Sequence, residues 1–257
     1  MTRSLSAKEH PMARKVKVIA HRGGREWAPE NTMAAFRQAL DLKVDGIELD
    51  VQRCATGELV VFHDDDVGRT TNGVGLVADI SLGELRRLDA GSWFDKAFRG
   101  EQVPTLQEVL ELVDGKCMLN IEIKNTPVSY ENIEEDVVAL LADYAHKESI
   151  IISSFDHYVL ARLAEIAPEY KLAVLNDAVV LDLPAYLARF GALYYHPGFD
   201  SCRADVVEEC HKNGIQVNSW TINGRKNWSR SLDLELDGIV TDDPEDLMVY
   251  LGRAVAV

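Results

Sequence analysis

Short apolar runs rich in Val, Ile and Leu alternate along the chain with longer segments of helical period, and this alternation constrains the fold more than any other feature. It is the pattern of repeated strand–helix units, whose strands pair in parallel. The expected helices include 31–42, 131–145 and 203–212. The expected strands are 16–20, 46–51, 59–62, 118–123, 150–152, 171–174, 192–195, 215–220 and 238–240.

The number and spacing of these strands favour a closed barrel. Segment 59–62 reads as a hairpin-like return from 46–51, which leaves about eight strands separated by helices, the pattern of a (β/α)₈ TIM barrel. A length of 257 residues suits a single barrel of this type. A doubly wound open sheet is the alternative that the same pattern leaves open. The predicted class is therefore α/β, with a TIM barrel as the preferred architecture.

One segment breaks the rhythm. Residues 64–104 are rich in Gly, Thr and Asp and show little sustained periodicity. A loop of this length inside a compact domain is uncommon unless it is functional. We therefore expect a small insertion after the second strand, with some local structure of its own, folded over one end of the barrel. The expected organisation is a flexible N-terminal extension over residues 1–15 and a single domain over residues 16–257.

Composition excludes several classes of partner. The formal net charge of −15 argues against a nucleic-acid binder and against stable association with an anionic membrane surface. No run reaches the roughly 18 apolar residues that a membrane span requires. Cys54, Cys117, Cys202 and Cys210 show no CxxC spacing, so reduced thiols are expected rather than a zinc or redox site. These features predict a soluble, cytoplasmic protein, and they leave the oligomeric state open.

Charged residues interrupt two of the apolar strands. Glu48 and Asp50 lie two residues apart, so they project from the same face of one strand, and Glu122 interrupts another. In a barrel the carboxyl ends of the strands meet at one mouth, where three carboxylates would repel one another strongly. A hard divalent ion with oxygen ligands, Mg²⁺ or Ca²⁺, would relieve that repulsion. The alternative is an ion-pair network with Arg22 and Lys124.

Other polar and aromatic residues stand at strand ends. His21 follows the first strand, His63 follows the return strand and Trp220 ends the segment 215–220. A histidine at a strand end is more often structural than catalytic, and Trp220 can be a core aromatic residue as easily as a pocket wall. Asp242, after the last strand, is interpreted as structural, and residues 31–32 as a helix N-cap.

A set of short motifs occurs in a fixed order over residues 16–250. The motifs are HRGG (21–24), APENT (28–32), GIELDV (46–51), VVFHD (60–64), RTTNG (69–73), LDAGSWF (88–94), VPTL (103–106), NIEIK (120–124), VNSWT (217–221) and GIVTD (238–242). Each is weak alone, but together and in this order they resemble the glycerophosphodiester phosphodiesterase family in its bacterial cytosolic form. Segments 25–27 and 54–57 depart from the family pattern, and both adjoin the expected mouth. These departures bear on substrate preference rather than on chemistry.

The resemblance implies a metal-dependent TIM-barrel enzyme that hydrolyses glycerophosphodiesters to sn-glycerol 3-phosphate and an alcohol. It implies that Glu48, Asp50 and Glu122 hold the divalent ion, Mg²⁺ or Ca²⁺. Two alternatives stay open. One is a phosphodiesterase of the phospholipase C or D type that acts on an intact lipid head group, and the other is a non-catalytic barrel that binds phosphodiesters.

The resemblance also gives roles to residues around the carboxylates. His21 and His63 match the family's acid/base pair, and Arg22 and Lys124 match the residues that hold the phosphate. We assign His21 as the base that activates a glycerol hydroxyl or a water, and His63 as the acid that protonates the departing alcohol. Trp220 is interpreted as a wall of the substrate pocket on the glycerol side. The identity of the alcohol is not readable from the sequence.

Overall fold

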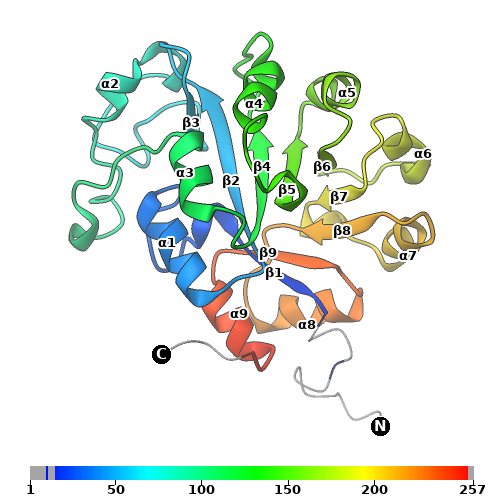
Figure 1. The fold of residues 1–257 in the computed structure, drawn as a ribbon. Helices are drawn as coiled ribbons and strands as arrows, with labels where there is room; N and C mark the ends of the chain where they lie inside the picture. The colour runs from blue at the N-terminus through cyan, green and yellow to red at the C-terminus, as the bar shows by residue number, and fades with distance from the viewer. Residues whose placement is uncertain (1–9, 11–14, 254–257) are drawn as a thin grey trace.

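Eight parallel strands close into a barrel in the computed structural model, which describes residue 10 and residues 15–253 (Figure 1). Apart from residues 10 and 15, the expected N-terminal extension lies outside the described residues. Each strand pairs in parallel with its neighbours, and β1 closes the ring by pairing with both β2 and β9. The barrel strands are β1 (Lys17–Ala20), β2 (Gly46–Arg53), β4 (Met118–Ile123), β5 (Ile150–Ser154), β6 (Lys171–Asn176), β7 (Tyr194–Pro197), β8 (Gln216–Ser219) and β9 (Gly238–Thr241).

This closed ring confirms the predicted TIM barrel, and the open doubly wound alternative is wrong. The barrel strand β7 begins two residues later than predicted. Leu193 is half exposed and precedes β7, whereas the polar His196 and the ring of Pro197 belong to the strand. The strand therefore extends into a polar segment that its apolar pattern did not mark.

Helices surround the ring of strands (Figure 1). The helix α3 illustrates why they form: its buried residues 106, 109, 110 and 113 recur at helical spacing, and a capping box of Thr105 and Glu108 starts it. No described helix combines the length and the apolar character needed to cross a membrane. The helices outside the ring are α1 (Met33–Leu42), α3 (Leu106–Val113), α4 (Ile133–Leu141), α5 (His157–Ile166), α6 (Leu183–Ala188), α7 (Ala204–Lys212), α8 (Arg225–Asp233) and α9 (Pro244–Tyr250).

The expected helix over 131–145 is shorter in the structure. The helix α4 ends at Leu141, and the following N–H of Ala142 bonds three residues back to Ala139 rather than four. Tyr144 then turns away, so that its hydroxyl oxygen accepts a hydrogen bond from the N–H of Gly115 at 2.9 Å. A tertiary contact thus replaces the last helical turn that the sequence pattern suggested.

The main apolar core lies between the strands and the helices. Leu49, Ile121 and Ile152 point outward from their strands, where they pack with helical residues such as Phe36 and Leu163. Because strand side chains alternate, the intervening residues point into the barrel. There Ile151, Ala173 and Tyr194 form a small apolar layer, and polar residues fill the positions nearer the carboxyl ends of the strands.

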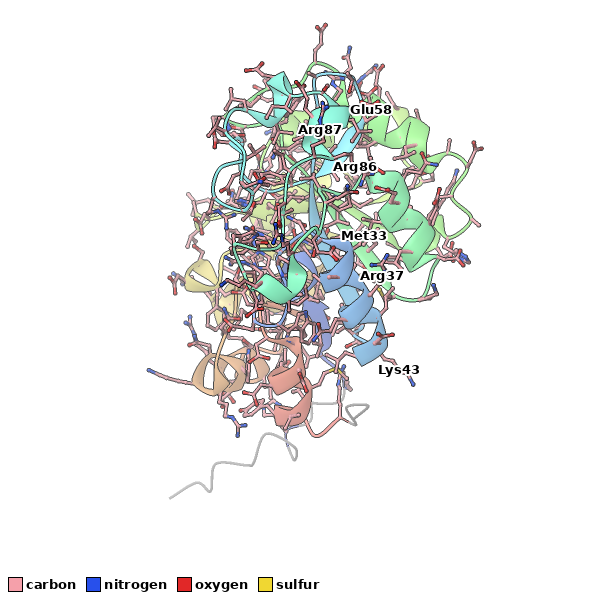
Figure 2. The ribbon with its side chains drawn as sticks, turned by 90° about the vertical axis from the view of Figure 1, so that its left-hand side faces the viewer. Met33, Arg37, Lys43, Glu58, Arg86 and Arg87 are labelled. Carbon is pink, nitrogen blue, oxygen red and sulfur yellow. The ribbon has the colours of Figure 1, made fainter. Side chains whose placement is uncertain are left out.

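The segment 64–104 packs beside the outer end of β2. The strand β3 (Leu59–Val61) pairs antiparallel with that end, and η4 (Val77–Asp79), α2 (Leu82–Leu85) and η5 (Lys96–Phe98) follow. Arg86 forms an ion pair with Glu108 of α3, on the face of the molecule seen in Figure 2. The segment shares a small apolar cluster with residues of and next to β3, made of Cys54, Val60, Phe62, Val67, Val77, Leu85, Ala90 and Val103.

The close packing of this segment gives a testable prediction at Gly91. A Cβ there would lie 1.9 Å from the carbonyl oxygen of Phe98, which is backbone and cannot rotate away. Gly91→Ala should lower the free energy of unfolding by roughly 1–3 kcal/mol. Gly83→Ala is the matched control, because an added Cβ in α2 meets nothing within 4 Å and alanine favours a helix by up to about 1 kcal/mol. Urea denaturation measures the free energy of unfolding of both variants. A wild-type value for Gly91→Ala would contradict the close approach of Gly91 to the Phe98 carbonyl oxygen.

Candidate active site

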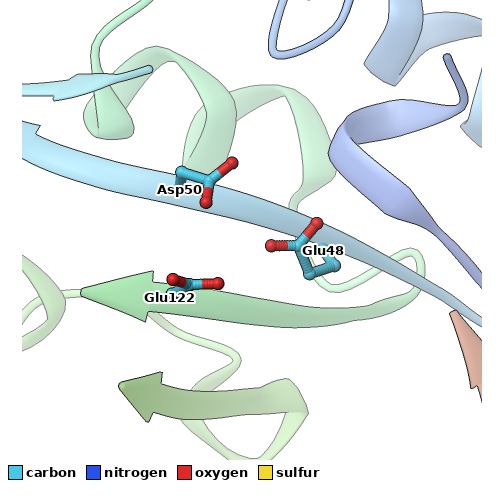
Figure 3. Close-up of side chains that lie close together, drawn as sticks. All are labelled: Glu48, Asp50 and Glu122. Atoms are coloured by element: carbon cyan, nitrogen blue, oxygen red, sulfur yellow. The ribbon is translucent and has the colours of Figure 1, made fainter. Parts of the chain in front are cut away.

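The strand register brings three carboxylates together. Asp50 of β2 is the register partner of Glu122 of β4, and Glu48 is the partner of Asn120, so these side chains share the inner face of the barrel. One oxygen from each of Glu48, Asp50 and Glu122 lies within 4.8 Å of the others (Figure 3). All three residues are buried. The structure therefore assembles the three predicted metal ligands at one point.

Crowding perturbs the three carboxyl groups in opposite directions. Burial, followed by the charges of Asp50 and Glu122, raises the pKa of Glu48 well above its usual value. Burial and the charge of Asp50 likewise raise the pKa of Glu122. Burial acts in the same direction on Asp50, but the cations Arg22 and Lys124 outweigh it and hold the pKa of Asp50 well below its usual range. The charge of Asp50 thus makes the other two carboxylates harder to ionise.

The site fits a hard divalent cation. The Oδ1 atom of Asp50 is buried and has no hydrogen-bond partner among the described residues. An orphan acceptor among crowded carboxylates is the kind of atom that a cation satisfies, and an all-oxygen donor set suits Mg²⁺ or Ca²⁺. The alternative ion-pair network is present in part, since Lys124 Nζ lies 2.8 Å from Glu122 Oε1 and Arg22 Nε lies 3.4 Å from Asp50 Oδ2. Lys124 Nζ also lies 3.7 Å from Asp50 Oδ1, an ion pair that leaves this oxygen without a hydrogen bond.

Arg22 lies in a tight turn directly after β1. The 3₁₀ turn η3 (His21–Gly23) gives Arg22 a left-handed backbone with φ of 51°, and its backbone N–H donates to Glu48 Oε2 at 2.9 Å. Its guanidinium Nη1 donates to Glu30 Oε1 at 2.7 Å. Lys124 follows β4 and reaches the carboxylates from the other strand. The two predicted phosphate-binding cations therefore flank the carboxylate cluster.

His21 is paired with a carboxylate at one ring nitrogen and faces the site with the other. Its Nδ1 lies 2.7 Å from Asp242 Oδ1, and its Nε2 lies 4.0 Å from Glu48 Oε2. Burial lowers the pKa of His21 below its usual value although Asp242 opposes that shift. Burial raises the pKa of Asp242, but hydrogen bonding and charge from His21 overcome this and lower it to about 2. At neutral pH the Nδ1–H of a neutral imidazole thus donates to Asp242, and Nε2 keeps its lone pair.

His63 has a similar partner in a more open setting. Its Nδ1 lies 2.6 Å from Asp64 Oδ1, and its side chain is 29% exposed. Burial raises the pKa of Asp64, but hydrogen bonds from Arg69 and His63 overcome this and lower it to about 2. Because Asp64 occupies Nδ1, Nε2 is the nitrogen that His63 can offer to a substrate.

A pocket with a volume of about 90 Å³ joins these groups, and its two walls differ in character. Trp220 belongs to the less charged wall, where its ring meets Phe155 edge to face at a centroid distance of 5.4 Å and its Nε1 donates to the His196 carbonyl. The charged wall, with the polar Asn120, includes His21, Arg22, Glu48, His63, Glu122 and Lys124. The opposite wall includes Phe155, Leu175, His196, Trp220, Thr221 and Val240. This division suits a substrate with an anionic group and an organic group.

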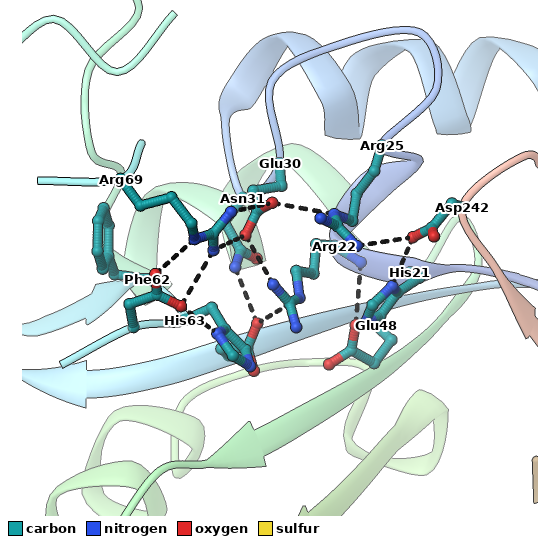
Figure 4. A network of polar contacts seen from close by, with 12 residues as sticks. His21, Arg22, Arg25, Glu30, Asn31, Glu48, Phe62, His63, Arg69 and Asp242 are labelled. Atoms are coloured by element: carbon teal, nitrogen blue, oxygen red, sulfur yellow. Dashed lines mark hydrogen bonds and ion pairs between the residues drawn. The ribbon is translucent and has the colours of Figure 1, made fainter. Parts of the chain in front are cut away.

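Several contributing residues were missed or undervalued by the sequence analysis. Asp242, interpreted as structural, contacts His21, and its position directly after the last barrel strand was the available signal. Thr32 does cap α1, but Asn31 instead donates to Asp50 Oδ2 at 2.9 Å. Glu30 and Arg69 lie in the quoted motifs, yet no local pattern indicated that they contact each other (Figure 4).

Comparison with known proteins is consistent across family, sequence and structure. A family model described as the Glycerophosphoryl diester phosphodiesterase family matches residues 21–246, a range that includes every predicted site residue. A glycerophosphodiester phosphodiesterase from Caldanaerobacter subterraneus subsp. tengcongensis is 45% identical over 236 residues, which cover 91% of this chain and 97% of that protein. A glycerophosphodiester phosphodiesterase from Bacillus altitudinis is 40% identical over 233 residues, which cover 89% and 95%.

A solved structure gives the same picture for the fold. A phosphodiesterase from Oleispira antarctica, solved in complex with the product sn-glycerol-3-phosphate, superposes with a TM-score of 0.86 at 29% identity. The superposition covers 93% of this chain and 98% of that chain. The similarity therefore extends over the barrel and the segment 64–104 rather than over a fragment.

The carboxylate cluster predicts cation-dependent stability. After exhaustive chelation, Mg²⁺ or Ca²⁺ at about 100 times its dissociation constant should stabilise the fold by roughly 2.7 kcal/mol. This corresponds to a rise in Tm of roughly 5–10 °C for a chain of this size. Asp50→Asn should abolish the rise, whereas Asp205→Asn, an exposed residue paired with Arg203, should retain it. A wild-type Tm that responds to neither ion would exclude a cation at this site.

Proposed function

The chain belongs to the glycerophosphoryl diester phosphodiesterase family and is an enzyme with that activity, and we propose that it releases sn-glycerol 3-phosphate by metal-dependent acid–base catalysis in the pocket described above. One observation carries the proposal: two imidazoles, two cationic side chains and the carboxylates of Glu48 and Glu122 line the same small pocket, and Asp50 lies directly beside those two carboxylates. The organic product is the remaining alcohol. The phospholipase alternative is not favoured by the comparisons, and a non-catalytic barrel does not fit the family.

The first requirement of the reaction is to neutralise the negative charge that develops on the phosphate oxygens. We assign Glu48, Asp50 and Glu122 as the ligands of Mg²⁺ or Ca²⁺, which when bound would act as a Lewis acid toward the phosphate oxygens. Arg22 offers a planar guanidinium and Lys124 a point charge for the same oxygens. Their contacts with the carboxylates keep both cations in place before a substrate arrives. Such preorganised charge is usually the largest single contribution to catalysis.

His21 is assigned as the general base. Its unprotonated Nε2 faces the pocket, and the carboxylate of Asp242 stabilises the positive charge that develops on the ring when it takes a proton. The proton comes from a nucleophile, either a water, which gives sn-glycerol 3-phosphate directly, or the neighbouring glycerol hydroxyl, which gives a cyclic phosphate that a water then opens to the same product. As the new bond to phosphorus forms, the bond from phosphorus to the departing alcohol oxygen breaks.

His63 is assigned as the general acid on the other side of the phosphate. Its Nε2–H protonates the departing oxygen, while Asp64 accepts the hydrogen bond from Nδ1 and supports the protonated ring. The greater exposure of His63 allows it to exchange protons with solvent between turnovers. Trp220, with Phe155, is assigned to the wall that contacts the organic part of the substrate.

We also propose a cytoplasmic location. All four cysteines of the chain are free. Burial raises the pKa of Cys117 and Cys210 to about 12 in each case, so both stay protonated and unreactive at neutral pH. Free, inert thiols are typical of proteins in a reducing compartment.

The substrate class can be tested with a panel of glycerophosphodiesters. Purified enzyme with Mg²⁺ or Ca²⁺ is given the choline, ethanolamine, inositol and bis-glycerol diesters, and a coupled glycerol 3-phosphate dehydrogenase reports the product. We expect release of sn-glycerol 3-phosphate from at least one diester and none from intact diacyl phospholipid. Hydrolysis of the intact lipid alone would instead support the phospholipase alternative, and no release from any member would contradict the proposal.

The acid role of His63 predicts a dependence on the leaving group. His63→Ala should lower turnover of an alkyl-alcohol diester by ~10²–10⁴, because the alkoxide then leaves unprotonated. An activated nitrophenyl diester, whose leaving group needs no proton, should lose much less. His211→Ala is the control, since that exposed histidine pairs with Asp237 and neither residue lines the pocket. Equal losses on both diesters would reject the role.

A further inference from the structure

Arg69, a side chain of the segment 64–104, reaches the groups around the pocket and joins two carboxylates. Its Nη2 and Nη1 donate to the two oxygens of Glu30 at 2.7 and 3.0 Å. Its Nη2 also lies 3.0 Å from Asp64 Oδ1, and its Nε donates to Asp64 Oδ2 (Figure 4). The guanidinium is therefore engaged in paired contacts on both sides. Such planar paired contacts fix orientation as well as distance, which a lysine cannot reproduce.

The first partner, Glu30, is a buried and firmly held anchor. Its side chain is only 3% exposed. Besides Arg69, it accepts a hydrogen bond from Arg22 Nη1 at 2.7 Å and one from Arg25 Nε at 2.9 Å. Burial raises the pKa of Glu30, but the hydrogen bond from Arg69 and the charge and hydrogen bond of Arg22 overcome this and lower it to about 2. Three guanidinium groups thus hold one charged carboxylate in place.

The second partner, Asp64, holds an imidazole of the proposed acid–base pair. Its Oδ1 lies 2.6 Å from His63 Nδ1, and its side chain is 29% exposed. Without Arg69, a carboxylate this exposed would be held only by its contact with His63 and could rotate together with the imidazole. Arg69 contacts both of its oxygens and so removes this freedom. The result is a continuous chain of contacts from buried Glu30 through Arg69 and Asp64 to His63.

We propose that Arg69 is a positioning residue for His63: it clamps Asp64 against the buried Glu30 and thereby fixes the imidazole in the orientation needed to protonate the departing alcohol. The inference rests on the proposed function, because it assumes that His63 is the proton donor. It differs from an ordinary surface ion pair, which contributes little. One partner of Arg69 is buried, and the other holds a residue of the reaction.

The other contacts of Glu30 make the role separable from folding. When Arg69 is removed, Arg22 and Arg25 still hold Glu30, so its buried charge stays paired. Asp64 keeps its bond to His63 but loses both contacts that orient it. The effect of the substitution should therefore fall on His63 and only weakly on stability.

The test compares Arg69→Ala with Arg69→Lys in the whole enzyme. For glycerophosphocholine, or the best diester of the panel, kcat of Arg69→Ala should fall ~10- to 100-fold, the scale of loss that a misplaced catalytic group produces. The nitrophenyl diester should be affected much less. Arg69→Lys should recover part of the loss, because lysine keeps the positive charge but lacks the planar guanidinium that makes paired contacts. Arg162→Ala is the matched control, since Arg162 also bridges two carboxylates, those of Glu135 and Glu165, but on the exposed surface.

A double variant separates positioning of His63 from a general structural effect. Because Arg69 acts through His63, the combination of Arg69→Ala and His63→Ala should be no slower than His63→Ala alone. If the losses in kcat of the two single variants multiply in the double variant, the inference is overturned. Wild-type turnover of the alkyl diester by Arg69→Ala would overturn it as well. Should Arg69→Ala not fold, Arg69→Lys combined with His63→Ala serves for the same comparison. A wild-type enzyme without activity on any diester would refute the proposed function itself rather than the role of Arg69.

Discussion

Repulsion among three carboxylates at the mouth of the barrel is the constraint on which the rest of the site depends. Glu48, Asp50 and Glu122 are buried within a few ångströms of one another, where water screens their charges poorly. Arg22 and Lys124 stabilise Asp50, yet the pKa values of Glu48 and Glu122 remain raised. Without a further positive charge the three groups cannot all ionise together at low cost. The proposed metal ion would supply that charge, and together with Arg22 and Lys124 it would attract an anionic phosphate.

The barrel imposes this crowding and also makes it tolerable. Parallel pairing fixes Asp50 opposite Glu122, and the two-residue period of β2 places Glu48 on the same face. A shift of the strand register by one residue would turn these carboxylates outward, into the apolar layer between the strands and the helices. That layer, with residues such as Leu49 and Ile121, is extensive and fully buried, so it can support an unfavourable cluster inside the ring. Local cost at the site is thus offset by packing elsewhere.

What the sequence could predict followed from short-range patterns. The polar residues of β2 and β4 stood out because they interrupt apolar runs, and the strand–helix alternation favoured a barrel over a doubly wound open sheet. The contacts of Asp242 with His21 and of Arg69 with Glu30 join residues 221 and 39 positions apart, and no period connects them. The end of α4 was set by Tyr144, whose partner Gly115 lies 29 residues away. Partners of this kind emerge only when the chain has closed into a ring.

The two histidines show how different surroundings suit the same chemical group to two different proposed roles. His21 is deeply buried, and the carboxylate that it contacts, Asp242, follows the last barrel strand, so its neutral form is favoured and Nε2 can accept a proton. His63 is partly exposed beside Asp64, its neighbour in the sequence, and Arg69 of the segment 64–104 holds that carboxylate. Arg25 contacts both Asp242 and Glu30, while Arg69 contacts both Glu30 and Asp64. Glu30 is therefore connected through Arg25 to the carboxylate that contacts His21 and through Arg69 to the one that contacts His63. The barrel and the segment 64–104 thus fix the proposed base and acid relative to each other.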